Sequence, residues 1–212
     1  PMASRVIAGE EERRLLLTNE QYQSLRLLGR RRRVGIQGGA GTGKTLIAVT
    51  RAKELAANGM RTLLLCYNRP LSDHLEAVCS GIAYLEVANF HQFCERRFKQ
   101  HSRAYLAKAK SEQSVDDLYD VQYPLALYLL LDEHPEHFDA ILVDEAQDFG
   151  DEYWLPIQIM LQSEADSPLY LFYDLNQKLY KRGNGFPISP NDEFLLTTNC
   201  RNTKHIHRLI AG

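Results

Sequence analysis

The stretch Gly38-Gly39-Ala40-Gly41-Thr42-Gly43-Lys44-Thr45 decides how this chain of 212 residues is interpreted. It fits the pattern G-x-x-x-x-G-K-[ST], a loop that surrounds the phosphates of a nucleoside triphosphate. Glycines let the backbone turn tightly and bring its N–H groups against phosphate oxygens, where a side chain would clash. Lys44 adds a mobile positive charge for the β- and γ-phosphates, and the Thr45 hydroxyl is a ligand for Mg²⁺. The pattern predicts that the whole stretch binds ATP.

The residues on either side of this stretch support the motif. Val34-Gly35-Ile36 is a short apolar run typical of a buried strand. After the loop, apolar residues recur at helical spacing from Leu46 to Ala56, and Gly59 stands where a helix would end. A helix that begins at the loop turns the positive end of its dipole toward the phosphates. A fortuitous glycine-rich turn is the alternative interpretation.

Composition and charge limit the class of protein. Hydrophobic residues make up 44% of the chain and charged residues 25%, which is ordinary for a soluble globular domain. The net charge of −2 gives no global basic signal, so any contact with nucleic acid must come from a local face. No apolar run approaches a membrane span and no signal-peptide pattern opens the chain, so no membrane partner is expected. The four cysteines lack CxxC spacing and indicate reduced thiols in a cytoplasmic protein.

Further apolar runs alternate with helical patterns along the chain. They cover residues 61–67, 84–88, 140–143, 169–173 and 194–197. The run RTLLLCY at the first of these is continuously apolar rather than alternating, which indicates a parallel sheet covered on both faces. The order of elements predicts an α/β fold, a P-loop NTPase of the RecA-like kind with a mostly parallel central sheet flanked by helices.

The middle of the chain differs from the rest in composition. Residues 95–137 are charged and helical, with a leucine-rich stretch near their end and no strand-like run. They are predicted to form a small helical insertion in an ATP-binding domain made of residues 18–94 and 138–212, which follows an N-terminal tail, residues 1–17. Because the chain begins without Met and stops within a helical pattern, it is predicted to be a fragment of a longer protein.

Acidic and polar side chains follow the predicted strands where each strand ends. Asp144 and Glu145 come directly after the run at 140–143. Ligands of parallel α/β sheets bind outside the carboxyl ends of the strands, so these carboxylates should meet the phosphate-binding loop. Asp144 is predicted to hold Mg²⁺ together with Thr45, and Glu145 to orient or deprotonate the attacking water. A carboxylate pair that caps the next helix is the alternative.

Two more side chains are candidates for the γ-phosphate. Gln177 lies just beyond the run at 169–173 and carries an uncharged amide that can meet a γ-phosphate or a water. Arg201 follows the last predicted strand and could supply positive charge to the transition state, as an arginine finger does. On spacing alone, either residue could equally be an ordinary surface side chain.

The ordered set of motifs resembles the N-terminal motor domain of superfamily 1 helicases of the UvrD/Rep type. The resemblance covers essentially residues 18–210 and is carried by Thr18-Asn19-Glu20-Gln21, the loop at 38–45, Val143-Asp144-Glu145-Ala146-Gln147-Asp148, the segment 174–180 and Asn199-Cys200-Arg201-Asn202. The DEAQD word after an apolar strand is the most discriminating of these. The resemblance implies an ATPase that couples hydrolysis to movement on single-stranded DNA. Gln21 would read the adenine edge, and Gln177 and Arg201 would contact the γ-phosphate.

The same resemblance implies contacts with single-stranded nucleic acid, with DNA favoured. The candidate residues are Tyr67, Asn68, Phe90, His91, Tyr180 and Lys181. Aromatic faces stack on unpaired bases without sequence preference, which suits the three rings Tyr67, Phe90 and His91 at the ends of the runs at 61–67 and 84–88. An aromatic side chain beside a strand end is as often part of the core, so both interpretations stay open for these rings. Lys181 stands where the family commonly has a tryptophan, which favours contact with the nucleic-acid backbone.

The chain also departs from the family pattern. Cys200 stands where the family has a tyrosine that stacks on adenine, which leaves the preference for adenine open. The insertion at 95–137 is short for the DNA-contacting subdomain of the family. A translocating helicase works with a second motor domain, which this chain does not contain, so the isolated fragment is expected to be weakly active at most. A nucleotide-gated binding module or switch ATPase without unwinding is the alternative function, and a small-molecule kinase has no support.

Overall fold

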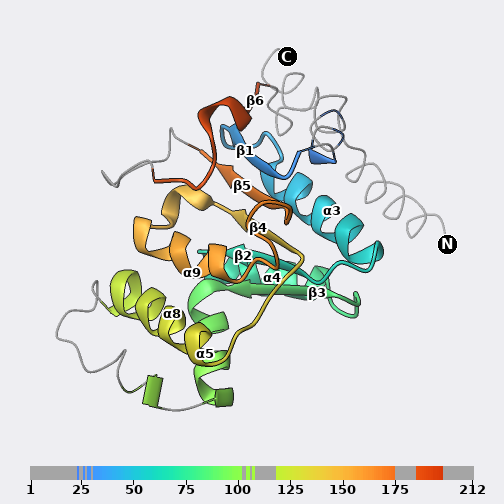
Figure 1. The fold of residues 1–212 in the computed structure, drawn as a ribbon. Helices are drawn as coiled ribbons and strands as arrows, with labels where there is room; N and C mark the ends of the chain where they lie inside the picture. Colours follow the sequence, from blue (N-terminus) through green and yellow to red (C-terminus); the bar gives the residue numbers. More distant parts are fainter. Residues whose placement is uncertain are drawn as a thin grey trace, which may run out of the picture.

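The computed structural model describes residues 31–101, 118–174 and 185–197, together with positions 23, 26, 28, 29, 104, 105 and 107. Within these residues six strands form one parallel sheet with the order β3-β2-β4-β5-β1-β6 (Figure 1). The strands are β1 (Arg33–Gly38), β2 (Thr62–Cys66), β3 (Leu85–Asn89), β4 (Ala140–Asp144), β5 (Leu169–Tyr173) and β6 (Glu193–Leu196). Every apolar run predicted as a strand forms one of them, so the predicted α/β fold with a parallel sheet is confirmed.

Helices cover both faces of this sheet. They are α3 (Lys44–Ala57), α4 (Arg69–Val78), α5 (Phe90–His101), α8 (Tyr123–Glu133) and α9 (Trp154–Ile159), with the short turns η1 (Leu118–Gln122), η2 (Ala146–Asp148), η3 (Asp151–Tyr153) and η5 (Pro190–Asp192). Buried side chains of α3 and α4 pack on one face, and those of α5, α8 and α9 pack on the other (Figure 1). Among the described residues, no helix combines the length and the apolar character needed to cross a membrane.

The central strands are buried on both faces. Along β2, Leu63 and Leu65 belong to the core beneath α5, α8 and α9, whereas Leu64 and Cys66 belong to the core beneath α3. All four side chains are fully buried. Successive side chains of a strand point to opposite faces, so a continuously apolar strand is what a sheet with two covered faces requires.

The helices of the predicted insertion are part of the main core. Phe93 and Phe98 of α5 and Leu127 of α8 are fully buried in the same cluster as Leu63 of β2. α5 begins directly at the end of β3 and runs through the predicted boundary at residue 95. The described helices of residues 95–137 thus pack against the sheet, and the division of the chain into a domain and an insertion stays a prediction. The predicted tail at 1–17 lies outside the described residues.

A network of ion pairs joins the starts of three strands, at the end of the sheet away from the phosphate-binding loop. Arg97 of α5 donates to Glu86 of β3 at 2.7 Å and to Glu136, which precedes β4, at 2.6 Å. Arg61, just before β2, also pairs with Glu136. Burial would raise the pKa of Glu136, but the hydrogen bonds and charges of the two arginines outweigh it and hold the pKa below its usual value. The stabilisation is therefore present at neutral pH and is lost as the pH falls through the lowered pKa.

Arg97→Ala is expected to destabilise the fold by about 3 kcal/mol, the lower end of the cost of breaking a buried ion pair by removing one partner. The Arg97 side chain is only 12% exposed, so its loss leaves two partly buried carboxylates without their main partner. Urea unfolding measures the change. Arg96→Ala on the same helix is the matched control, because Arg96 is 42% exposed and its contacts are longer. The control should cost less than about 1 kcal/mol. Equal losses in both variants would contradict the role given to Arg97.

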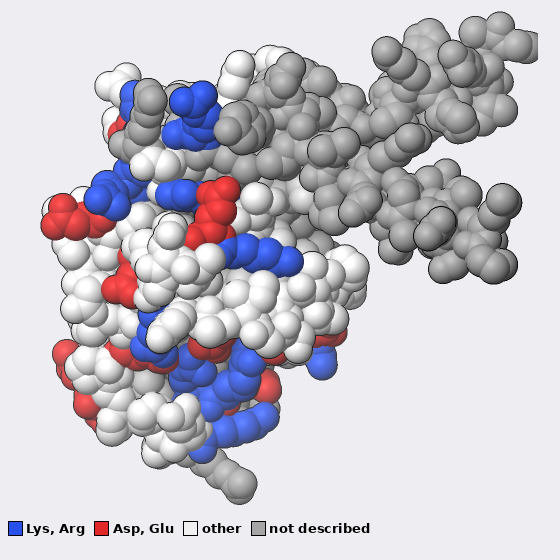
Figure 2. Space-filling view, turned by 90° about the vertical axis from the view of Figure 1, so that its right-hand side faces the viewer, with Lys and Arg blue, Asp and Glu red and all other residues white. Residues whose placement is uncertain are grey.

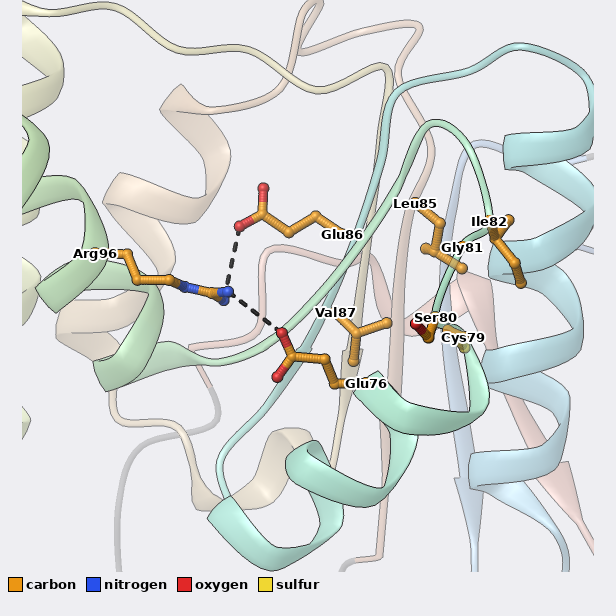
Figure 3. A pocket seen from close by; sticks show the side chains of 9 residues that line it. All are labelled: Glu76, Cys79, Ser80, Gly81, Ile82, Leu85, Glu86, Val87 and Arg96. Carbon is orange, nitrogen blue, oxygen red and sulfur yellow. Dashed lines mark hydrogen bonds and ion pairs between the residues drawn. The ribbon is translucent and has the colours of Figure 1, made fainter.

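The edge strand β3 is covered by a charged side chain. Arg96 reaches from α5 to Glu76 of α4 at 3.4 Å and to Glu86 of β3 at 3.7 Å, beside a hollow of about 290 Å³ (Figure 3). Exposed edge strands invite pairing with other chains, and charged side chains over the edge discourage it.

Figure 2 shows Lys and Arg side chains gathered low on one face with acidic side chains beside them. Because Arg96, Arg97 and Lys99 of α5 each pair with a glutamate, we do not assign phosphate binding to these residues.

Candidate nucleotide-binding site

The loop between β1 and α3 is closed by its own backbone. The Thr42 N–H and hydroxyl both donate to the carbonyl oxygen of Gly39, at 3.3 and 2.9 Å. Gly41 and Gly43 have φ angles of 85° and 86°, in the left-handed region that side chains disfavour. A Cβ on Gly38 would lie 2.5 Å from the Thr42 hydroxyl oxygen and 3.1 Å from the Leu196 Cβ, so a side chain there would displace its neighbours. The predicted glycine-rich turn is therefore a closed loop whose conformation favours glycine at Gly38, Gly41 and Gly43.

Lys44 is the first residue of α3 and lies over this loop. Its Nζ donates to the carbonyl oxygens of Gly38 and Gly39 at 2.7 and 3.3 Å, and the residue is only 6% exposed. The ammonium group thus lies beside the N-terminus of a helix of 14 residues, whose dipole is positive at that end. The Lys44 ammonium and the N-terminus of α3 both create positive potential beside the backbone of the loop. This combination suits a phosphate group.

Asp144 is the last residue of β4 and is fully buried. Its Oδ1 accepts the backbone N–H of Glu145 at 3.1 Å, whereas its Oδ2 is buried without a hydrogen-bond partner among the described residues. An unpaired buried carboxylate oxygen costs free energy unless a ligand satisfies it. A hard divalent cation or its water prefers such oxygen ligands, so the donor set of Asp144 and the neighbouring Thr45 hydroxyl fits Mg²⁺.

The protonation of Asp144 is set mainly by burial. Its pKa is raised to about 6, chiefly because burial disfavours the charged form. The Thr45 hydroxyl, the Glu145 N–H and the charge of Lys44 act in the opposite direction, while the neighbouring charge of Glu145 raises the pKa further. A cation bound to this carboxylate would favour its charged form. Asp144 is therefore a buried carboxylate whose charged form a bound cation would stabilise.

Glu145 adopts a backbone conformation that is rare for its residue type. Its φ of 51° and ψ of 45° lie in the left-handed region, and η2 begins at the next residue. Such conformations cost free energy and persist where the surroundings enforce them, often at functional sites. The chain turns sharply after β4, so the half-buried Glu145 stands directly beside Asp144.

The strand order brings the predicted groups together. β5 pairs with both β1 and β4, so the carboxyl ends of these three strands are neighbours. The phosphate-binding loop follows β1, Asp144 ends β4, and the nearly fully buried Asp174 follows β5. Of the predicted ATP-site residues, those at 38–45 together with Asp144 and Glu145 thus lie at one edge of the sheet. Gln21, Gln177, Cys200 and Arg201 lie outside the described residues.

A family model described as Schlafen group 3, DNA/RNA helicase domain, matches residues 31–184. The chain belongs to this family. The match contains the phosphate-binding loop and the β4 carboxylates, so this is a helicase-like P-loop domain, as the order of motifs predicted. A comparison with curated protein sequences found no match.

Solved structures of other P-loop proteins are similar to this Schlafen helicase-like domain. AMPPCP-bound DnaA from Aquifex aeolicus has a TM-score of 0.46 and 14% identity, covering 92% of this chain and 53% of that chain. Pif1 helicases at forked dsDNA give 0.48 and 14%, covering 90% and 46%. Bacteroides Pif1 bound to ssDNA gives 0.47 and 16%, covering 89% and 43%. The chain thus spans about half the length of these proteins.

Gln147 belongs to the DEAQD word, and its residue type alone predicts no role for it. Its side-chain amide lies between the Glu145 carboxylate and the backbone of Asp174. The signal was present in the DEAQD word, where an amide stands two residues after the predicted base. The sequence could not reveal the contact with Asp174, because the end of β5 comes close to Gln147 only in the folded sheet.

Of the predicted nucleic-acid residues, the four that the structure describes lie at the carboxyl ends of β2 and β3. Asn68 caps α4, its Oδ1 accepting the Leu71 N–H at 3.2 Å, and remains exposed. Tyr67 and His91 are half-buried, with ring centroids 5.6 Å apart in an edge-to-face contact. Phe90 is fully buried and its ring packs in the core, which favours the second of the two interpretations left open for it. Tyr180 and Lys181 lie outside the described residues.

His91 is held by its neighbours. Its Nε2 lies 3.3 Å from the carbonyl oxygen of Tyr119 and 3.2 Å from the hydroxyl of Tyr153. Burial lowers the pKa of His91, against the opposing effects of the Tyr119 carbonyl and nearby carboxylates. The exposed ring of Tyr119 stands 5.1 Å from the His91 ring, on the π-helical turn η1. An exposed aromatic side chain thus extends the aromatic group at the strand ends, and sequence reasoning missed it.

Proposed function

We propose that this chain is the ATP-binding motor domain of a nucleic-acid-dependent ATPase that couples ATP hydrolysis to movement on single-stranded DNA. One observation carries the proposal: Lys44, Asp144 and Glu145 converge at the carboxyl edge of the sheet, with the glutamate held in a strained backbone conformation beside the buried aspartate. Phosphoryl transfer needs mainly positioning and charge stabilisation, which this arrangement supplies. The UvrD/Rep type and the cooperation with a second motor domain belong to the same proposal.

Each residue has a proposed role in the reaction. Lys44 and the loop amides bind the β- and γ-phosphates, and Thr45 with Asp144 would hold Mg²⁺, which neutralises charge on the phosphate oxygens. Glu145 orients the attacking water and accepts its proton. Gln21 on the adenine edge, and Gln177 and Arg201 at the γ-phosphate, rest on the resemblance to helicases alone.

ATP turnover by the natural full-length protein, with and without single-stranded DNA, tests the proposal. Turnover should rise when DNA is added and should be lost in Glu145→Gln, which keeps the size of the side chain and removes the base. Turnover without DNA stimulation would count against a nucleic-acid motor. Nucleotide binding without any turnover would favour the switch ATPase or nucleotide-gated module instead.

We propose that single-stranded nucleic acid passes over the ends of β2 and β3. Tyr67, Asn68 and His91 lie there, and Tyr119 supplies an exposed ring beside them. Exposed aromatic rings form stacking platforms for unpaired bases. The same edge of the sheet carries the phosphate-binding loop, so a change at the nucleotide lies close to the proposed nucleic-acid path.

Tyr119→Ala is expected to weaken binding of an oligothymidine strand by about 1–3 kcal/mol, the typical value of one base–aromatic stack. That change corresponds to about a 5- to 150-fold higher Kd. Fluorescence anisotropy of the labelled strand, measured on the natural full-length protein, gives the Kd. Tyr84→Ala is the matched control, because Tyr84 is 62% exposed but precedes β3 at the other end of the sheet. An unchanged Kd for Tyr119→Ala, or an equal loss in the control, would remove Tyr119 from the proposed path.

A further inference from the structure

The side chain of Gln147 connects two strand ends that are far apart in the sequence. Its Nε2 donates to the Glu145 carboxylate at 2.7 Å, and its Oε1 accepts the backbone N–H of Asp174 at 3.0 Å. Glu145 follows β4 and Asp174 follows β5, and these strands are neighbours in the sheet. The orientation of the amide follows from its partners: a backbone N–H can only donate, so the oxygen faces Asp174 and the NH₂ faces the carboxylate.

This bridge acts on the residue with the strained backbone. Glu145 has a positive φ, and its N–H is already engaged by Asp144 Oδ1. The hydrogen bond to Asp144 thus fixes the backbone of Glu145, and the hydrogen bond from Gln147 fixes its carboxylate. Asp174, the far end of the bridge, is 2% exposed, so the anchor lies in a well-packed part of the fold.

We propose that Gln147 is a positioning residue that holds the Glu145 carboxylate at the reacting water by tying it to the end of β5. The inference rests on the proposed ATP hydrolysis and gives that reaction a specific geometric requirement. A base acts only within hydrogen-bond reach of the proton it takes. A displacement of about 1 Å can lower a rate about 100-fold, so a carboxylate without this bridge should be a poor base.

Two substitutions in the natural full-length protein test the bridge. Gln147→Glu keeps the shape and the acceptor for the Asp174 N–H but replaces the donor by a second carboxylate that repels Glu145. Gln147→Met keeps a similar length and removes both hydrogen bonds. Each is expected to lower kcat for ATP about 10- to 100-fold. KM and the Kd for a fluorescent ATP analogue should stay near the wild-type values, because Lys44 and the loop are untouched.

The pH profile supplies a measurement that a purely structural role would not change. A protonated glutamic acid carries an O–H donor as well as an acceptor, so it can restore both ends of the bridge. The ratio of kcat in Gln147→Glu to kcat in the wild type should therefore rise as the pH is lowered. The same ratio for Gln147→Met should stay flat, since that side chain cannot donate in either condition.

Controls separate this inference from the proposed function. Gln162→Glu makes the same charge change at an exposed position after α9 and should leave kcat unchanged. If wild-type turnover is present and depends on Glu145, yet Gln147→Glu and Gln147→Met keep wild-type kcat, the positioning role is overturned alone. A loss of kcat in Gln147→Glu that does not recover at low pH relative to Gln147→Met would also overturn it. Absence of turnover in the wild type overturns the proposed function and this inference together.

Discussion

Lys44→Ala is expected to lower ATP turnover by about 10²- to 10³-fold, the effect of removing one donor that stabilises transition-state charge in a well-characterised protease. The Lys44 ammonium is nearly buried and is fixed over the loop by two carbonyl oxygens. Its position is therefore prepared before the nucleotide arrives, so little reorganisation opposes its action. A coupled assay of phosphate release, run at saturating Mg·ATP, measures the loss.

Lys53→Ala is the matched control for this change. Lys53 lies on the same helix, is half-buried and donates to the Val78 carbonyl oxygen at 3.4 Å, away from the loop. The control should keep wild-type turnover, and both variants should unfold at similar urea concentrations. If Lys44→Ala bound and hydrolysed ATP like the wild type, the assignment of the loop as a phosphate site would fail.

The phosphate-binding loop could be predicted because its information is local. The glycines, Lys44 and the flanking apolar runs stand within one strand–turn–helix unit, and each residue type is required by that unit's own geometry. The position of Asp144 could be predicted for a related reason: a carboxylate directly after a buried strand of a parallel sheet must lie at the carboxyl edge. In the structure both segments lie at the carboxyl edge of the sheet, and their roles stay predictions.

Other features depend on contacts between distant segments. Phe90 and Tyr67 both follow a strand and are both aromatic, yet one is fully buried and the other half-buried. The sequence pattern is the same for both, and only the packing of α5 on the sheet decides between core and surface. The positive φ of Glu145 likewise has no local signal, because glutamate does not favour that conformation.

Composition alone does not show how the middle segment packs. Its charged residues include Arg97, which joins Glu86 and Glu136 inside an ion-pair network. Its leucine-rich stretch lies on α8, whose Leu127 is buried in the main core. Charge along a sequence does not distinguish a solvated face from a paired, partly buried one.

Asp144→Asn is expected to stabilise the nucleotide-free protein by about 1–3 kcal/mol at about pH 7.5 while removing Mg²⁺-dependent ATP turnover. The raised pKa of about 6, against 3.8 in the unfolded chain, means that ionised Asp144 costs the fold up to about 3 kcal/mol. The neutral amide avoids that cost, although its buried NH₂ must itself find a partner. Urea unfolding in the absence of nucleotide and metal measures the gain.

The pH dependence of the unfolding free energy tells at which pH the gain from Asp144→Asn should be largest. Between pH values of about 4 and 6 the folded wild type binds more protons at Asp144 than the unfolded chain does, so its stability falls as the pH rises. The advantage of Asp144→Asn should therefore shrink by roughly 1–2 kcal/mol when the pH is lowered from about 7.5 to about 5. Asp139→Asn is the control, since the half-buried Asp139 carboxylate already accepts the Arg61 N–H at 2.7 Å and should show no gain.

The outcome distinguishes a site built for a cation from a carboxylate that merely packs well. If Asp144 were satisfied by protein alone, its replacement by asparagine would destabilise the fold at every pH, because a hydrogen-bonded charge would be lost. Suppose instead that Asp144→Asn is more stable than the wild type at neutral pH, that this gain shrinks at low pH, and that it disappears when Mg²⁺ and ATP are added to the wild type. The fold would then keep an unfavourable buried charge for its ligand. Such a trade between stability and function is expected where a strained, desolvated site must bind a metal–nucleotide complex.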